Sequence, residues 1–211
     1  MRLLKKLFEI DRTEKILEFF NKPDSIILEI GVHEGKFSEI ILNKFKPKKL
    51  ILVDPWSFEK DTIYNESLYG NNATLNLENP NDKKIIDKQE LQDLYYHGIL
   101  KKFEAEIKDN KVEVIRKKSS EAFEIFDNNF FDMIYIDGNH LYDFVMSDIL
   151  SSLNKIKNDG IIVCDDYKND SNWFKDGVTK AINLLKKRRK IKIIHEHNFF
   201  SRHNQCIFKK I

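Results

Sequence analysis

The sequence predicts an α/β fold built on a doubly wound, mostly parallel sheet. Four short apolar runs that end in acidic residues carry this prediction, and they are Ile26–Glu29, Leu50–Asp54, Met133–Asp137 and Ile161–Asp166. Nearly continuous apolar runs bounded by turn residues are typical of strands buried on both faces of a sheet. Segments with helical periodicity alternate with these runs, which favours βα units joined by right-handed crossovers.

Helices and further strands are expected at defined places between the four runs. Apolar residues at helical spacing predict helices over 3–21 (one or two pieces), 35–45, 88–108, 119–126, 141–157 and 176–189. Ser119-Ser120 is expected to cap the fourth of these, and Asn158-Asp159-Gly160 to form a tight stop before the next strand. Val112–Ile115 alternates as a further strand, and residues 191–196 and 206–208 are expected to close the chain as a hairpin.

Residues 57–87 interrupt this alternation. They are rich in asparagine and show weak periodicity, and a long irregular stretch in a compact domain is usually a functional or disordered loop. Because the stretch leaves the sheet next to Asp54, it is predicted to be a lid or substrate insertion. Trp56, Tyr64, Tyr69 and Trp173 could form an aromatic wall around a substrate or could simply pack.

Size and composition fit one domain over residues 1–211, with residues 1–24 as an N-terminal helical segment. Lys+Arg (36) and Asp+Glu (34) nearly cancel to +2, so net charge does not argue for nucleic acid or a membrane. Two cysteines do not make a disulfide framework, and acidic residues from Glu9 onward interrupt any leader-like apolar core. A cytoplasmic protein without nucleic-acid or membrane partners is expected, and assembly into a homo-oligomer is left open.

Carboxylates collect where the predicted strands end. In open parallel sheets, ligands bind beyond the carboxyl ends of the strands, so Glu29, Asp54, Asp137, Asp165 and Asp166 are expected to share one rim. Such a rim suits amines, ribose hydroxyls and hard metal ions, and it suits bare phosphates poorly.

The turn Gly31-Val32-His33-Glu34-Gly35 follows the first strand and opens a helix. Glycines there let the backbone approach a ligand, and Asp54 at the end of the next strand can accept both hydroxyls of a ribose. The turn lacks the third glycine of the dinucleotide fingerprint, so the two features favour an adenosine ligand without a pyrophosphate. The simpler alternatives are an ordinary βα turn and a turn carboxylate before Pro55.

An ordered set of motifs carries a resemblance to a known family. The set is Glu29-x-Gly31-x-x-x-Gly35, Asp54-Pro55-Trp56, Ser119-Ser120, Ile136-Asp137-Gly138-Asn139-His140-x-Tyr142 and Gly160 to Tyr167. It resembles class I S-adenosylmethionine-dependent methyltransferases, and more narrowly the metal-dependent group that includes the macrocin and mycinamicin sugar O-methyltransferases. The resemblance covers roughly residues 25–210.

The resemblance implies a strand order of 3-2-1-4-5-7-6 and a set of cofactor contacts. Glu29, Gly31 and Gly35 would surround the methionine moiety, Asp54 would hold the ribose, and Ser119 would lie near the adenine, with Asp137 also counted at the cofactor. The methyl acceptor would be a hydroxyl of a sugar, a glycan precursor or a similar polyol-like small molecule.

Asp137, Asp165 and Asp166 are the predicted metal ligands. Carboxylates at the ends of neighbouring parallel strands can share one cation, and oxygen ligands suit Mg²⁺. The absence of a nearby thiolate argues against zinc. In the resembling group these three acids are the metal ligands. The alternative is that they are turn and capping residues.

His140 is the predicted catalytic base, with Asp137 beside it. A neutral imidazole is the right base near neutral pH, and the matching histidine is the proposed base in the resembling sugar methyltransferases. Asn139 departs from the acid that is commoner at its position in that group. A polar surface histidine is the alternative.

Two other functions stay open. One is a hydroxylase-like relative on the same core, which would need a redox metal that the acidic rim does not favour. The other is a cofactor-binding module without catalysis. Nucleobase N-methylation is disfavoured, because Asp165-Asp166-Tyr167 stands where such enzymes carry an Asn-Pro-Pro-Tyr type motif.

Overall fold

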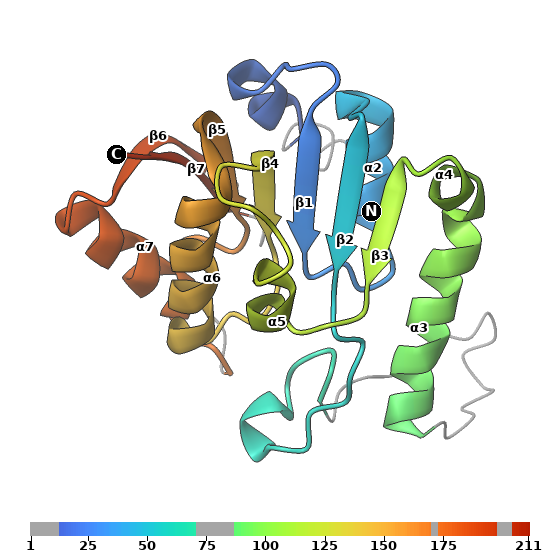
Figure 1. Ribbon diagram of the computed structural model, residues 1–211. Coiled ribbons are helices and arrows are strands. Elements are labelled where there is room, and N and C mark those ends of the chain that lie inside the picture. Colours follow the sequence, from blue (N-terminus) through green and yellow to red (C-terminus); the bar gives the residue numbers. More distant parts are fainter. Residues whose placement is uncertain (1–12, 71–86, 170–172, 198–203) are drawn as a thin grey trace.

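A computed structural model describes residues 13–70, 87–169, 173–197 and 204–211 (Figure 1). Seven strands form one sheet in the order β3-β2-β1-β4-β5-β7-β6. The strands are β1 Ile26–Ile30, β2 Lys49–Val53, β3 Val112–Ile115, β4 Phe131–Ile136, β5 Ile156–Cys164, β6 Ile191–His197 and β7 Gln205–Lys210. The helices are α2 Lys36–Phe45, α3 Lys88–Lys102, α4 Glu104–Lys108, α5 Ser119–Phe123, α6 Tyr142–Lys155 and α7 Gly177–Lys187, with a 3₁₀ turn η1 at Thr62–Tyr64.

The predicted doubly wound sheet and its strand order are confirmed. Strands β1 to β5 pair in parallel, while β7 pairs antiparallel with both β5 and β6. The apolar runs form the strands because they are covered on both faces: all six residues of β4 are buried, as are the last four of β1 and β2. The terminal hairpin places β7 inside the sheet and β6 at its edge.

Helices cover both faces of the sheet, and alternate strand residues divide the core into two clusters. Leu28 and Ile30 face the cluster that contains α5, α6 and α7, which lie in front of the sheet in Figure 1. Ile27 faces the other cluster, where α2, the end of α3 and the helical residues 13–19 pack. None of the helices in the described ranges combines the length and the apolar character that crossing a bilayer requires.

The structure corrects three details of the predicted elements. The helix expected over 88–108 is interrupted at Phe103, which leaves helical geometry and buries its ring. Ser119 does not cap α5: the cap position is Lys118, and the Ser119 hydroxyl bonds Asp148 instead. Asn158–Gly160 does not end an element before β5, because β5 begins at Ile156 and these residues form an irregularity in its pairing with β4.

Several expectations fall partly outside the described residues. These are the first part of the N-terminal helical segment (1–12), residues 71–86 of the predicted lid and residues 198–203 between the two strands of the predicted terminal hairpin. The described part of the predicted lid, residues 57–70, contains η1 and is otherwise turns and irregular backbone.

Candidate active site

The carboxyl ends of the parallel strands β2, β1, β4 and β5 lie side by side at one edge of the sheet. Each strand is extended by a single backbone hydrogen bond to its neighbour: Asp54 N to Ile115 O (3.3 Å), Gly31 N to Val53 O (3.0 Å), Asp137 N to Ile30 O (2.8 Å) and Asp165 N to Ile136 O (3.0 Å). The first residue after each strand is therefore fixed in the sheet ladder. This arrangement places Asp54, Asp137 and Asp165 of the predicted rim at one edge of the sheet, whereas Glu29 lies inside β1.

Gly31 is the residue whose backbone the site depends on most. It has a φ of +85°, and a Cβ built on it would lie 2.1 Å from the carbonyl oxygen of Asp137. A side chain would thus collide with backbone that does not move easily, as well as strain its own. In the structure the close approach at Gly31 is made to the loop after β4, and the predicted approach to a ligand stays a prediction.

Asp54 organises the glycine-containing turn. Its Oδ2 accepts hydrogen bonds from the backbone N–H groups of Val32 (2.9 Å) and His33 (3.0 Å), and Oδ1 accepts from Trp56 N (2.7 Å). Burial raises the pKa of Asp54, and these three backbone donors oppose that rise. The carboxylate is therefore a structural part of the turn, whatever else it binds.

Three further residues predicted at the cofactor, Glu29, Gly35 and Ser119, lie in different parts of the fold. Glu29 is buried and accepts a hydrogen bond from the Ser38 hydroxyl at 2.6 Å, which ties β1 to α2. Gly35 has a φ of +68° and starts α2 against the side chains of Ile99 and Phe103. Ser119 begins α5 and donates to Asp148 at 2.5 Å.

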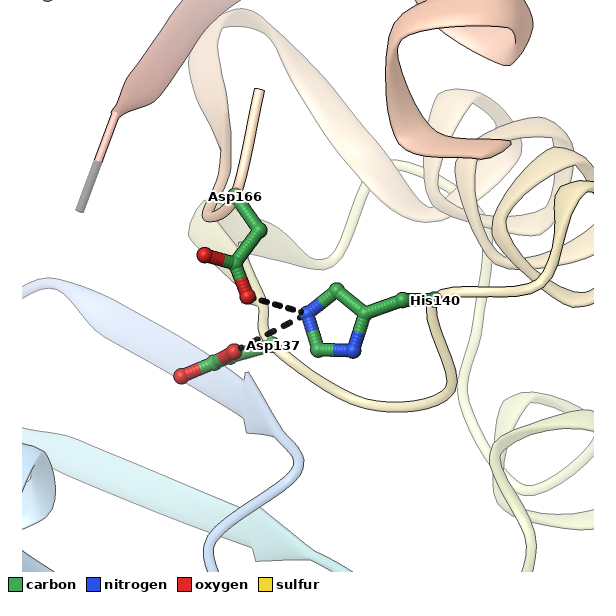
Figure 2. Close-up of side chains that lie close together, drawn as sticks. All are labelled: Asp137, His140 and Asp166. Atoms are coloured by element: carbon green, nitrogen blue, oxygen red, sulfur yellow. Dashed lines mark ion pairs between the residues drawn. The ribbon is translucent and has the colours of Figure 1, made fainter. Parts of the chain in front are cut away.

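Asp137, His140 and Asp166 meet at the rim between β4 and β5 (Figure 2). Nε2 of His140 lies 2.9 Å from Oδ2 of Asp166 and 3.4 Å from Oδ1 of Asp137, although neither contact has hydrogen-bond geometry. One ligand atom from each residue falls within 4.8 Å of the others, so two carboxylate oxygens and an imidazole nitrogen converge. These three residues form what we call the acid–histidine cluster.

Burial and neighbouring charges shift the pKa values of Asp137 and His140 in the acid–histidine cluster. Burial and the neighbouring Asp165 raise the pKa of Asp137 to about 7, although His140 opposes the rise. Burial lowers the pKa of His140, but Asp137 and Asp166 outweigh it and raise that pKa to about 10. The cluster therefore holds carboxylates at a cost that a bound cation would offset, and it keeps His140 protonated while the carboxylates are charged.

Asp165, the third predicted metal ligand, lies outside the acid–histidine cluster. Its Oδ2 accepts a hydrogen bond from the Tyr135 hydroxyl (2.9 Å), which in turn accepts one from the Gln205 amide (2.8 Å). Its Oδ1 accepts from the backbone N–H of Asp166 (3.0 Å). Asp165 thus fixes the backbone of Asp166, whose φ of 55° lies in the left-handed region.

Three of the four predicted wall aromatics gather beside the acid–histidine cluster. The rings of Tyr64, Tyr69 and Trp173 contact one another at centroid distances of 5.6 to 6.2 Å, and Trp173 meets the ring of His140 at 5.8 Å. Trp56 is elsewhere: it is fully buried, packs on Tyr96 and donates from Nε1 to the carbonyl of His33.

Asn139 joins the loop after β4 to the segment 57–70. Its Nδ2 donates to the Tyr64 hydroxyl at 3.1 Å, while its Oδ1 accepts from the backbone N–H of Leu141 at 3.0 Å. With Asn139 the amide donates and the Tyr64 hydroxyl accepts, whereas an acid in this place could only accept from that hydroxyl. Asn139, where the resembling group more commonly has an acid, thus takes part in a specific hydrogen bond in this chain.

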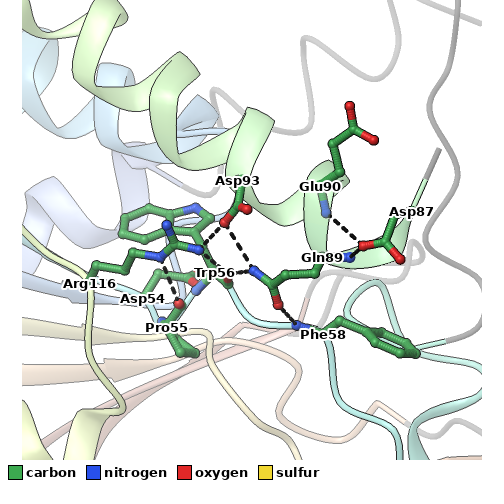
Figure 3. Close-up of polar contacts among 9 residues, drawn as sticks. All are labelled: Asp54, Pro55, Trp56, Phe58, Asp87, Gln89, Glu90, Asp93 and Arg116. Carbon is green, nitrogen blue, oxygen red and sulfur yellow. Dashed lines mark hydrogen bonds and ion pairs between the residues drawn. The ribbon is translucent and has the colours of Figure 1, made fainter.

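A polar clamp that sequence reasoning missed holds the segment after β2 against α3 (Figure 3). Arg116, just after β3, donates to the carbonyls of Pro55 (3.4 Å) and Trp56 (2.9 Å) and pairs with Asp93. Gln89 donates to Trp56 O (3.1 Å) and accepts from Phe58 N (2.9 Å). The clamp fixes the backbone that follows Asp54. Its members are far apart in the sequence, and no local pattern connects them.

Comparison with known proteins identifies the family. A family model described as a methyltransferase domain matches residues 28–167, which span the glycine turn, Asp54 and the acid–histidine cluster. The chain belongs to this methyltransferase family. It is also 27% identical over 175 residues to an uncharacterized protein of Acanthamoeba polyphaga mimivirus, a match that covers 82% of this chain and 64% of the viral protein.

Solved structures share the fold at low sequence identity. A Clostridium thermocellum protein assigned as an rRNA methylase has a TM-score of 0.63 at 9% identity, covering 96% of this chain and 95% of its own. A Streptococcus mutans protein assigned as a methyltransferase and solved with S-adenosylhomocysteine has 0.60 at 11%, covering 96% and 97%. An S-adenosylmethionine-dependent methyltransferase of Aquifex aeolicus has 0.59 at 13%, covering 94% and 89%. At sequence identities this low, the structural similarity shows a shared fold and nothing further.

Proposed function

We propose that this protein is an S-adenosylmethionine-dependent O-methyltransferase that methylates a hydroxyl of a small sugar-like or polyol-like acceptor with the help of a divalent cation. The observation that carries the proposal is the convergence of Asp137, His140 and Asp166 at the strand ends of a methyltransferase domain. Two carboxylates and an imidazole in one place are suited to binding a cation and removing a hydroxyl proton.

The rim residues fit the proposed cofactor, which supplies an activated methyl group on its sulfonium. Glu29, Gly31 and Gly35 are retained as the predicted methionine contacts. A carboxylate offers about four acceptor positions. Backbone donors of the described residues use three positions on Asp54, which leaves capacity for a ribose hydroxyl. Ser119 is retained as the predicted neighbour of the adenine.

The acid–histidine cluster also fits a divalent cation. Asp137 and Asp166 would hold it, and the cation would supply positive charge that neutralises these carboxylates and acidifies the acceptor hydroxyl. Asp165 is proposed to contribute by fixing the Asp166 backbone, with direct ligation as predicted from the sequence being the alternative. Magnesium is the proposed ion, because carboxylate oxygens are its preferred protein ligands.

His140 is proposed as the base that takes the acceptor proton at Nε2. The two carboxylates hold its pKa at about 10 when they are uncompensated, so their neutralisation is a requirement for this role. Its ring lies against Trp173 and Phe174, which fixes the direction in which Nε2 faces. Holding the acceptor oxygen and the methyl donor together supplies much of the acceleration of such a transfer.

The proposed activity is tested by transfer of labelled methyl groups from S-adenosylmethionine to a panel of glycosides, nucleotide sugars and polyols, with an RNA arm for comparison. Chelator and Mg²⁺ add-back test the cation, and base-stable label in the product distinguishes a methyl ether from a methyl ester. Cation-independent transfer would contradict the metal mechanism. Tight cofactor binding without transfer to any acceptor would favour the non-catalytic module.

A further inference from the structure

Residues 57–70 form a compact loop closed on itself. The backbone N–H of Glu59 donates to the carbonyl of Tyr69 at 2.9 Å, so the two ends of the excursion lie together. Inside it, the Ser67 hydroxyl donates to Tyr64 O at 2.8 Å, and a Cβ on Gly70 would overlap that same carbonyl. Compact loops with adjacent ends are frequently functional.

This loop contacts residues that surround the acid–histidine cluster. Asn139 bonds the hydroxyl of Tyr64, whose side chain is buried, and the Tyr64 and Tyr69 rings both contact Trp173. Trp173 in turn lies against His140. The loop therefore lies beside the acid–histidine cluster.

The two tyrosines of the loop differ in how their hydroxyls are used. Tyr64 accepts the Asn139 hydrogen bond, whereas the buried Tyr69 hydroxyl has no hydrogen-bond partner among the described residues. A buried polar group without a partner costs about 1–3 kcal/mol and calls for an explanation. Burial raises the pKa of Tyr69, and the charges of Asp54 and Asp137 add to the rise, so the phenol stays a donor.

The chemistry of the rim indicates what this donor meets. Glu29, Asp54 and Asp137, the acids predicted at the cofactor, offer acceptors, which match the ammonium group and the ribose hydroxyls of S-adenosylmethionine. The carboxylate of the cofactor has the opposite requirement, because it needs donors. The unpaired phenol of Tyr69, whose ring contacts Trp173 beside the acid–histidine cluster, is such a donor, and hydrogen bonds to an ionised acceptor are the strong ones.

We propose that Tyr69 is a cofactor-binding residue whose hydroxyl donates a hydrogen bond to the carboxylate of the methionine moiety, so that the loop 57–70 closes over the cofactor. The inference rests on the proposed use of S-adenosylmethionine. It adds to that proposal a specific residue, a specific atom of the ligand and a role for the loop.

Calorimetric titration with two probes tests this. S-adenosylhomocysteine carries the carboxylate, and its decarboxylated analogue lacks only that group. Tyr69→Phe removes the hydroxyl and keeps the ring, so it should weaken S-adenosylhomocysteine about tenfold or more and leave the decarboxylated analogue unchanged. The matched control Tyr64→Phe, whose hydroxyl is already paired, should leave the ratio of the two affinities as in the wild type.

The melting temperature of the ligand-free protein supplies the second readout. Tyr69→Phe should leave it unchanged or raise it, because the variant loses an unpaired buried hydroxyl, whereas Tyr64→Phe should lower it. Equal loss of both probes, no loss of either, or a lower melting temperature for Tyr69→Phe would overturn the assignment of Tyr69. A wild-type protein that binds neither probe would instead overturn the proposed cofactor, and this assignment with it.

Discussion

Nε2 of His140 lies 2.9 Å from Oδ2 of Asp166, which joins the loop after β4 to the loop after β5. Asp137 approaches the same nitrogen at 3.4 Å. Two carboxylates close together in a half-buried place are unfavourable unless something compensates their charge, and here His140 does so when protonated. The same geometry can serve a bound cation, with His140 released as a base.

Asp166→Asn should weaken cation binding and transfer together, because it removes one of the two carboxylates of the cluster. We expect Mg²⁺ to raise the melting temperature of the wild type and to have a much smaller effect on the variant, with Mn²⁺ and Co²⁺ as comparison ions. The exposed acid variant Glu124→Gln is the control and should respond to Mg²⁺ as the wild type does. Identical Mg²⁺ responses in Asp166→Asn and the wild type would contradict the proposed site.

His140→Ala separates the role of base from that of metal ligand. A positioned general base contributes roughly two to four orders of magnitude to turnover, so we expect a loss of that size. The Mg²⁺ concentration for half-maximal activity and the affinity for S-adenosylhomocysteine should change little. A large rise in the Mg²⁺ requirement would show that His140 is a ligand, and an unchanged rate would place the base elsewhere.

Gly31→Ala tests the close approach of β1 and β4 at the rim. The new Cβ would overlap the Asp137 carbonyl at a positive φ, so we expect a loss of roughly 2 kcal/mol or more in the free energy of unfolding. Gly98→Ala is the matched control: it lies inside α3 with no atom within 4 Å of its Cβ position, and it should stabilise by about 0.5–1 kcal/mol. Chemical denaturation measures both, and wild-type stability in Gly31→Ala would contradict the packing described.

Asp148 gives stability a defined pH dependence. Burial raises its pKa to about 6, although the Ser119 hydroxyl opposes this. The native state thus holds a proton that the unfolded chain has released between about pH 4 and 6, so this contribution to stability is lost as pH rises through that window. Asp148→Asn should therefore gain roughly 1–3 kcal/mol over the wild type at pH 7–8 and nothing below pH 4.

Denaturation curves across this pH range check the prediction for Asp148. The exposed residue Asp143, in the first turn of the same helix, provides the control variant Asp143→Asn, which should show no gain that grows with pH. If the stability curves of Asp148→Asn and the wild type run parallel from pH 4 to 8, the buried carboxyl does not act as described.

The strands were predicted well from the sequence because strands that are buried on both faces consist almost entirely of apolar residues. The runs ending at Glu29, Asp54 and Asp137 correspond to β1, β2 and β4 to within a residue or two. Asp54 and Asp137 follow their strands at one edge of the sheet because parallel strands point the same way, whereas Glu29 lies inside β1. The strand order itself came from the family resemblance and is confirmed.

The remaining details depend on directions and long-range contacts that composition does not encode. Asp165 and Asp166 are adjacent, yet one turns to Tyr135 and the other to His140, because Asp166 adopts a left-handed backbone. The interruption at Phe103 is hidden because apolar spacing continues on both sides of it. The clamp around Arg116 and the bond from Asn139 to Tyr64 join residues that are far apart in the chain.

The most direct test of the central claim, that this rim binds S-adenosylmethionine, is calorimetric titration of the wild-type protein with S-adenosylhomocysteine beside Asp54→Asn. We predict one molecule bound per chain and a melting temperature that rises with ligand concentration. The variant should bind more weakly, because an amide cannot replace both carboxylate oxygens that orient the turn and face the ribose. Absence of heat and of any thermal shift at saturating ligand would contradict the account.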